Sequence, residues 1–215
     1  MHDGCNAPVS AQDQGGMARR GKVTVVLFLD IEGAFPNAVT LHLLHNLRMC
    51  QVPERYVRFI EQMLTNRRTR LKFDGFTSDW VGVDNGIVQG DPLSMILYLF
   101  YNADLIDGAK KGEAKIAYVD NANYYAEGID FEEAYEKLRD MMTREGGGQD
   151  WSRWHNSKFE MSKLTLVGFS RWQAPDPSHL GKLRPESRPN LELNGAIIKP
   201  SVSHKFLGVL FDQEL

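Results

Sequence analysis

Two residues at a predicted tight turn, Asp120 and Asn121, have oxygen-bearing side chains of the kind that bind divalent cations. They separate two β-prone segments, residues 115–119 and 122–126. Because Asp and Asn tolerate the left-handed backbone of a two-residue hairpin turn, the pattern predicts a strand, a turn on this pair, and a second strand. A carboxylate at such a tip is held rigidly at the end of a sheet, which suits a metal ligand. The same residues are common in plain surface turns, so this interpretation depends on the rest of the chain.

A second acidic residue, Asp30, ends an apolar and β-branched run over residues 22–30. Such a run is typical of a strand buried on both faces. Acidic groups at the ends of buried strands lie where open α/β sheets place their ligands. Asp30 could equally cap the turn that follows the strand, and the spacing alone leaves both interpretations open.

The loop over residues 85–94 leads into a predicted helix over residues 92–108. Asp91 is placed to cap this helix, and Pro92 suits its first turn. Gln89 and Gly90 belong to a glycine-flanked polar loop that can approach a nucleotide or a base pair closely. Many loops that enter a helix have this composition, so the pattern by itself is weak.

The densest basic patch of the chain lies in residues 66–72, NRRTRLK. Its arginines Arg67, Arg68 and Arg70 alternate with other residues in a way that could follow a phosphate backbone. A solvated loop entering a strand explains the same pattern equally well.

Composition sets the broad class. The chain has 215 residues, 42% of them hydrophobic, and a formal net charge of −3. Its overall charge therefore does not indicate nucleic-acid binding, and any such contact must be local. The cysteines, Cys5 and Cys50, are far apart and lack metal-binding spacing, which argues for a reducing compartment. Residues 1–21 are expected to form a loose leader without the apolar core of a signal peptide. With no apolar run of membrane-spanning length, we expect an intracellular protein, in the nucleus or the cytoplasm, without membrane contact.

Hydrophobic periodicity predicts an α+β fold. We expect helices over residues 40–50, 54–64, 92–108 and 131–144, and an antiparallel sheet of strands near residues 23–30, 115–119, 122–126 and 164–169. A hairpin over residues 70–83 turns around Gly75, and residues 171–190 form a long loop. Asn194-Gly195 predicts a hairpin over residues 191–199, which should form a small second sheet with a strand over residues 205–211.

Four segments together resemble the reverse transcriptases in order and spacing. LFLDIEGAF (27–35), GIVQGDPLS (86–94) and AYVDNANYYAEG (117–128) are similar to the aspartate, glutamine-loop and Tyr-x-Asp-Asp motifs of that family. KFLGVLFD (205–212) resembles its primer-grip strands. The most similar subset is the non-LTR, LINE-type retrotransposon polymerases of fungi. The resemblance covers residues 22–215, which implies one palm-like domain with a ferredoxin-like antiparallel sheet backed by helices.

The resemblance implies a role for each matched residue. A polymerase palm holds two Mg²⁺ (or Mn²⁺) ions for nucleotidyl transfer, and the ligands would be Asp30, Asp120 and the backbone carbonyl of Ile31. Phe35 would block a ribose 2′-hydroxyl, and Gln89 and Gly90 would line the incoming nucleotide and template base. Lys163 would neutralise or protonate the pyrophosphate. The remaining implied contacts are to an RNA template and a DNA primer, with the primer grip at Phe206, Leu207 and Gly208.

The chain departs from the family pattern at three positions. Asn121 replaces the second aspartate of the turn, Pro36 replaces a frequent acid, and Met95 replaces a frequent proline. Losing one charge about 4 Å from a cation is worth roughly 4 kcal/mol at an effective dielectric near 20, so a rate loss on the order of a hundredfold is expected even for a residue outside the first ligand shell.

We expect fingers and thumb to be lacking, which would expose apolar palm surfaces and favour self-association. Two function classes therefore stay open. One is an RNA-directed DNA polymerase domain of weak or lost activity, and the other is a non-catalytic retroelement remnant that binds nucleic acid or protein.

Overall fold

The computed structural model describes residues 21–214, so the predicted leader lies almost wholly outside the described residues. The chain forms two compact units. One comprises residues 28–124 and 139–164, and the described part of the other comprises residues 21–27, 125–138 and 165–214. The assignment of residues 22–215 to a single palm-like domain stays a prediction.

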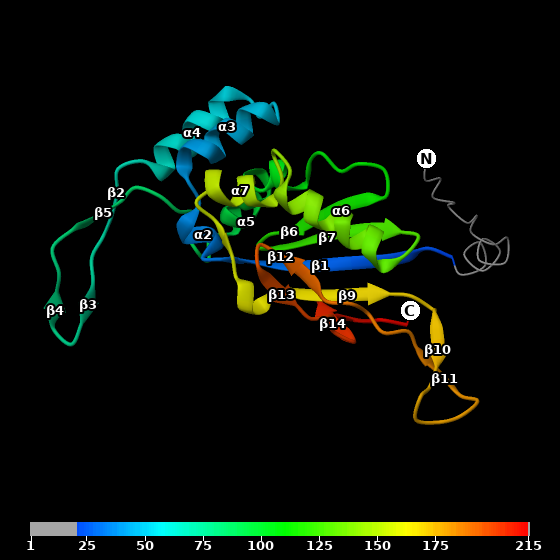
Figure 1. The fold of residues 1–215 in the computed structure, drawn as a ribbon. Helices are drawn as coiled ribbons and strands as arrows, with labels where there is room; N and C mark the ends of the chain where they lie inside the picture. The colour runs from blue at the N-terminus through cyan, green and yellow to red at the C-terminus, as the bar shows by residue number, and fades with distance from the viewer. Residues whose placement is uncertain (1–20, 215) are drawn as a thin grey trace, which may run out of the picture. The chain divides into compact units, whose positions relative to one another are not determined.

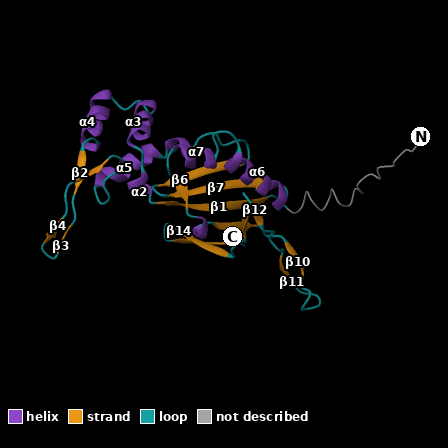
Figure 2. Ribbon diagram, turned by 60° about the vertical axis from the view of Figure 1, so that its left-hand side comes forward, coloured by secondary structure: helices purple, strands orange, loops and turns teal. Residues whose placement is uncertain are grey.

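A sheet of five strands runs through the fold, with the order β6-β7-β1-β8 and with β9 also paired to β1. Figure 1 and Figure 2 show β6, β7 and β1 side by side. The strands are β1 (Val23–Glu32), β6 (Glu113–Tyr118), β7 (Asn121–Gly128), β8 (Lys158–Phe159) and β9 (Thr165–Phe169). All four predicted strands are present, and β8 is an addition that pairs antiparallel to the end of β1 at Ile31 and Glu32.

Strand β1 contributes buried apolar residues to both units. Leu27 of the second unit and Phe28 and Leu29 of the first are consecutive buried residues, although Thr24 and Val26 earlier in the strand are only half-buried. The prediction of a strand buried on both faces therefore holds for the stretch that leads to Asp30. The largest fully buried side chains of the first unit outside β1 come from its helices and strands, among them Leu43, Leu47, Leu64, Leu97, Tyr98, Tyr101, Leu105 and Tyr124.

The predicted helices are present, with one shortened. The first unit contains α2 (Ala34–Asn37), α3 (Thr40–Met49), α4 (Glu54–Leu64), α5 (Pro92–Tyr101) and α7 (Gly148–Trp154), and α6 spans Phe131–Thr143. The prediction of one helix over residues 92–108 was wrong, because α5 ends at Tyr101 and a 3₁₀ turn, η1 (Ala103–Ile106), follows. A second 3₁₀ turn, η2, spans Met161–Lys163. Gly146 and Gly147 separate the end of α6 from the start of α7 at Gly148.

A long two-stranded arm projects from the first unit between α4 and α5, away from α3 and α4 (Figure 1 and Figure 2). Its base pairs β2 (Arg67–Thr69) with β5 (Val81–Val83), and its end pairs β3 (Lys72–Phe73) with β4 (Phe76–Thr77). Asp74 and Gly75 make the turn, both with positive φ. The predicted hairpin around Gly75 is therefore confirmed, and it begins earlier than expected.

The second unit ends in three short hairpins. They are β10 (Gln173–Pro175) with β11 (Leu183–Pro185), β12 (Leu191–Leu193) with β13 (Ala196–Ile198), and β14 (Ser203–Phe206) with β15 (Val209–Asp212). The turn at Asn194-Gly195 is confirmed. Three other expectations were wrong. Residues 171–190 contain a hairpin, residues 205–211 turn back at Leu207 and Gly208, and β12-β13 and β14-β15 are separate sheets.

Candidate functional site

The turn that carries Asp120 lies one residue earlier than predicted. Strand β6 ends at Tyr118 and β7 begins at Asn121, so the two turn residues are Val119 and Asp120. Val119 takes the left-handed conformation with φ of 55°. Because Asp and Asn tolerate left-handed backbone, the sequence predicted a turn on Asp120 and Asn121. In the structure Asn121 is already the first residue of β7, so the turn falls on Val119 and Asp120 instead.

Asp30 lies in β1, and Asp120 lies in the turn just before the neighbouring strand β7, both within the first unit. The backbone N–H of Ile31 donates a 3.1 Å hydrogen bond to the carbonyl of Asp120, which joins the end of β1 to the β6–β7 turn. The carbonyl of Asp30 accepts from the N–H of Glu160 at 2.9 Å. Backbone contacts therefore fix both aspartates at one end of the sheet.

Lys163 supplies the positive charge of this site. It closes the 3₁₀ turn η2, and its Nζ donates to Asp30 Oδ2 at 2.8 Å. The hydrogen bond and charge of Asp30 raise the pKa of Lys163, with a smaller contribution in the same direction from Asp120. The ammonium therefore stays charged at neutral pH and lies within the field of both carboxylates.

Asn121 contacts the same carboxylate that the family resemblance makes a metal ligand. Its Nδ2 donates a 3.0 Å hydrogen bond to Asp120 Oδ1. An aspartate at this position would bring a second negative charge and further acceptor oxygens, whereas the amide nitrogen occupies one acceptor site of Asp120.

The aromatic and glutamine-loop residues approach each other through backbone hydrogen bonds. Phe35 lies in α2, and its carbonyl accepts from the N–H of Ile87 at 2.8 Å. Gly86 has φ of 88°, and a Cβ at this position would come within 2.7 Å of the carbonyl oxygen of Pro36. Only glycine therefore allows the loop to approach the backbone of α2 this closely. Gln89 and Gly90 follow directly and are exposed.

The cap of α5 matches the sequence prediction. Asp91 Oδ1 accepts a 2.8 Å hydrogen bond from the N–H of Leu93, and Pro92 occupies the first turn. This local geometry fixes where the exposed Gln89–Gly90 loop gives way to the helix.

The three arginines of the basic patch have different surroundings. The guanidinium of Arg67 donates to the carbonyls of Leu64, Asn85 and Gly86, so it ties the base of the arm to the ends of the flanking segments. Arg68 is exposed, and Arg70 stacks over Trp80 with 4.6 Å from Cζ to the ring centroid. Nucleic-acid contact by these arginines stays a prediction.

The residues matched to a primer grip belong to the second unit. Phe206 ends β14, while Leu207 and Gly208 form the exposed turn to β15, with φ of 48° and 88°. They are thus at the tip of a hairpin, and their relation to Asp120 stays a prediction.

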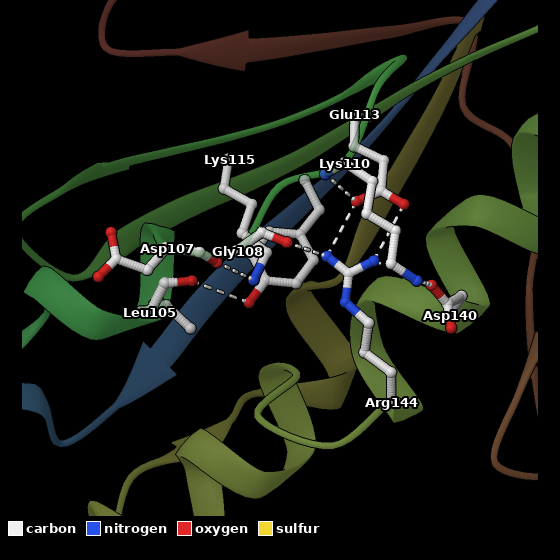
Figure 3. A network of polar contacts seen from close by, with 9 residues as sticks. Leu105, Asp107, Gly108, Lys110, Glu113, Lys115, Asp140 and Arg144 are labelled. Carbon is white, nitrogen blue, oxygen red and sulfur yellow. Dashed lines mark hydrogen bonds and ion pairs between the residues drawn. The ribbon is translucent and has the colours of Figure 1, made fainter.

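A buried ionic network supports the β6–β7 hairpin, and the sequence did not reveal it. Arg144, just after α6, makes a two-pronged pair with Glu113 at 2.9 and 3.0 Å, and Figure 3 shows Asp140 and Lys110 beside this pair. Glu113 is 3% exposed in its side chain, and Arg144 is 14% exposed. Burial alone would raise the pKa of Glu113, but the hydrogen bond and charge of Arg144 hold it below its ordinary value.

Asn102 is the other residue that sequence reasoning missed. It caps the C-terminus of α5, is 2% exposed, and its Nδ2 donates to the carbonyl of Val119 in the turn. The sequence does contain a sign of this role. Asn102 follows Tyr98 by four residues, so it is a polar residue at a position that continues the buried, apolar face of α5.

Asp30 and Asp120 are the side chains of this site that could hold a metal ion. Within residues 21–214, no group of three or more His, Cys, Asp or Glu side chains is placed to hold a metal ion. Two carboxylates near one end of a sheet suit Mg²⁺, which proteins bind through one or two carboxylates together with substrate phosphates.

Comparison with known proteins identifies the family of the chain. Residues 3–211 match the family model described as "Reverse transcriptase (RNA-dependent DNA polymerase)". The chain belongs to the reverse transcriptase family. The class of enzyme expected from the motifs, RNA-directed DNA polymerase, is thereby confirmed at the level of the family.

The curated relatives of this reverse transcriptase domain are retrotransposon proteins. The RNA-directed DNA polymerases from mobile element jockey of Drosophila funebris and Drosophila melanogaster are 25% and 24% identical over 194 residues, which is 87% of this chain. The Pol polyprotein of the type-1 retrotransposable element R2 from Popillia japonica is 32% identical over 79 residues, which is 37% of this chain and 13% of that protein. The chain spans about a fifth of the length of the jockey proteins, 19% in both cases.

Solved structures confirm the fold class. Candida tropicalis telomerase truncated from its C-terminal domain has a TM-score of 0.53 at 10% identity, and covers 76% of this chain and 34% of its own. Telomerase from the same organism, in complex with a TWJ fragment of telomeric RNA, has a TM-score of 0.51 at 10% identity over 73% of this chain and 28% of its own. These similarities show an α+β, polymerase palm-like fold.

Proposed function

We propose that this chain is the palm region of a fungal non-LTR retrotransposon reverse transcriptase that adds deoxynucleotides to a DNA primer on an RNA template. The observation that carries the proposal is the joining of Ile31 N–H to the carbonyl of Asp120, because it puts the two motif aspartates at one end of the sheet. The fungal assignment rests on the motif resemblance. Action on an RNA template is consistent with a location in the nucleus or the cytoplasm.

Asp30 and Asp120 would hold two Mg²⁺ or Mn²⁺ ions, with the carbonyl of Ile31 as a further ligand. Such ions stabilise the attacking and leaving oxygens of phosphoryl transfer when they are bound. Lys163 already pairs with Asp30 across 2.8 Å, so a cation is accommodated beside this carboxylate. The same ammonium can neutralise charge on the leaving pyrophosphate or donate a proton to it.

The incoming nucleotide would lie between α2 and the glutamine loop. Phe35 packs on Tyr98 with 5.2 Å between ring centroids, and this contact holds the aromatic ring that would exclude a 2′-hydroxyl. Gln89 and Gly90 are exposed beside it and can contact the nucleotide and the template base. Arg68 and Arg70 on the arm would contact the nucleic-acid backbone, and Phe206, Leu207 and Gly208 would contact the primer.

Asn121 favours low activity. Its amide occupies an acceptor site of Asp120 and leaves the start of β7 one charge short of the family pattern. This observation supports a second candidate function, a retroelement remnant that binds nucleic acid without chemistry.

Primer extension with Asn121→Asp separates the two candidates. When fingers and thumb segments are supplied in the same polypeptide, the restored charge should raise Mg²⁺-dependent extension of a DNA primer on an RNA template on the order of a hundredfold over the same polypeptide with Asn121. Asp30→Ala in the same background should abolish extension. Extension that survives Asp30→Ala would contradict the proposed metal site, and no extension by this polypeptide with or without Asn121→Asp would favour the binding remnant.

A further inference from the structure

The residue before Asp120 has a backbone that its own side chain disfavours. Val119 has φ of 55° and is 7% exposed. Left-handed backbone brings Cβ close to the following carbonyl oxygen, and a β-branched residue adopts it only rarely. Such a conformation persists where surrounding contacts impose it. The turn that presents Asp120 therefore depends on what holds Val119.

The side chain of Asn102 holds the carbonyl of Val119. Asn102 is 2% exposed, and its Nδ2 donates to this oxygen. Because a carbonyl oxygen can only accept, the amide nitrogen of Asn102 must be the atom that faces it. The next carbonyl, that of Asp120, accepts from Ile31 N–H at 3.1 Å. Both carbonyls of the turn are thus fixed, one by the end of α5 and the other by β1.

We propose that Asn102 is a positioning residue that holds Val119 in its left-handed conformation and so aims the Asp120 carboxylate at the metal ions. The inference rests on the proposed function, because it assigns Asp120 the part of a ligand. It also links two motifs physically, since the helix that Asn102 caps begins just after Gln89 and Gly90.

The chain contains a matched control for this role. Asn46 is also a buried asparagine, 7% exposed, and its Nδ2 donates to the carbonyls of Phe100 and Tyr101 and to Asp104 Oδ1. It therefore holds the same end of α5 but has no hydrogen bond to the turn. If Asn102 served only to anchor the helix end, Asn46→Ala and Asn102→Ala should have similar effects.

The test is Mn²⁺ affinity, measured by electron paramagnetic resonance at a temperature where each variant is folded by circular dichroism. Asn102→Ala should weaken Mn²⁺ binding about tenfold, the lower end of the usual effect of removing a group that orients a ligand. Asn46→Ala should lower the melting temperature but leave the affinity near that of the wild-type chain. Asn102→Leu, which keeps volume and removes the donor, is measured alongside in case the alanine variant does not fold.

A second substitution at Val119 distinguishes a positioning role of Asn102 from a role in packing alone. Glycine adopts φ of 55° without strain, so Val119→Gly combined with Asn102→Ala should restore most of the lost affinity. Wild-type affinity in Asn102→Ala and Asn102→Leu, or a loss that Val119→Gly does not reverse, would overturn the inference. Asp120→Ala distinguishes a failure of the proposed metal site from a failure of the proposed role of Asn102. If it leaves Mn²⁺ binding intact, the proposed metal site itself is wrong. If it abolishes binding while the Asn102 variants bind normally, only the positioning role is wrong.

Discussion

Lys163 places an ammonium group on the carboxylate that would bind a metal ion. The pair with Asp30 is exposed on the lysine side, with 64% of the Lys163 side chain accessible and 27% of the Asp30 side chain. A cation that binds Asp30 must therefore share this carboxylate with Lys163 or displace the ammonium. In the proposed reaction the lysine would have two opposing effects, since it would neutralise a product phosphate but compete with the incoming metal.

This competition predicts that Lys163→Met strengthens Mn²⁺ binding. Removing the ammonium frees Asp30 Oδ2 and removes a like charge from the metal, so we expect a severalfold gain in affinity, limited by solvent screening. The measurement is an equilibrium Mn²⁺ titration of the variant and the wild-type chain. Lys158→Met is the matched control, because Lys158 is an exposed lysine of the neighbouring strand β8. Weaker Mn²⁺ binding by Lys163→Met would show that the lysine supports the ion instead.

At the residue scale, the motifs led to most of the candidate site. Asp30, Phe35 and Asp120 are recognisable because their neighbours in the sequence repeat a family pattern, and Asp91 is recognisable because caps obey a local rule. Asn102 escaped because its partner, Val119, is 17 residues away. A hydrogen bond between a helix end and a distant turn leaves only a polar residue on an apolar face as its trace in the sequence.

At the scale of elements, the Arg144–Glu113 pair attaches strand β6 to the segment after α6. Gly108 also accepts from Arg144, and Lys110 N–H donates to Glu113 at 2.9 Å, so the loop before β6 belongs to the same network (Figure 3). Because β6 leads directly into the turn with Asp120, this network fixes one side of the hairpin that presents the carboxylate.

Glu113→Gln should therefore destabilise the fold by about 2 kcal/mol at neutral pH, since it removes the buried carboxylate partner of Arg144 and leaves only the more exposed Asp140, at 2.9 Å, to balance the guanidinium. The pKa of Glu113 is depressed in the folded state, so its stabilisation is full above the unfolded-state value of 4.5 and is lost as the pH falls below that value. Urea unfolding at neutral and acidic pH tests both statements. The difference between the variant and the wild-type chain should shrink at acidic pH.

An exposed pair serves as the control for this prediction. Arg48 and Glu54 pair at 3.0 Å, but their side chains are 44% and 47% exposed. Glu54→Gln should leave the free energy of unfolding nearly unchanged. Equal effects of Glu54→Gln and Glu113→Gln would contradict the role given to burial.

Element types were easier to predict than element ends. The helices α3, α4 and α6 and the Asn194-Gly195 hairpin obey local rules, and their positions agree with the sequence prediction. The Val119-Asp120 turn, the stop of α5 at Tyr101 and the strand β8 depend on tertiary partners. Asn102 helps to set the first of these, and pairing of Phe159 with Ile31 creates the last.

At the scale of the whole molecule, large apolar side chains remain exposed on α5. Met95, Ile96 and Leu99 are 46%, 52% and 48% exposed, and their spacing places them on one side of the helix. No helix within residues 21–214 is long and apolar enough to cross a membrane. Clustered apolar area of this kind is typical of surfaces that bind another protein or associate with themselves.

We predict that these side chains drive self-association. Replacing Ile96 and Leu99 together by Glu should shift the chain towards monomer in sedimentation velocity, because charges oppose burial of this face. Leu41→Glu on α3 is the control, since Leu41 is 77% exposed and lies on another helix. A wild-type chain that stays monomeric at high concentration would contradict the prediction.

Iron-directed cleavage can show whether Asp30 and Asp120 hold one metal centre. Fe²⁺ bound in place of Mg²⁺ generates hydroxyl radicals with ascorbate and peroxide, and these cut the polypeptide next to the ion. If the two aspartates share one centre, cuts should appear near residue 30 and near residue 120, both suppressed by excess Mg²⁺ and both lost in Asp30→Ala. Cuts confined to one of these segments, or located elsewhere in the chain, would contradict a shared centre.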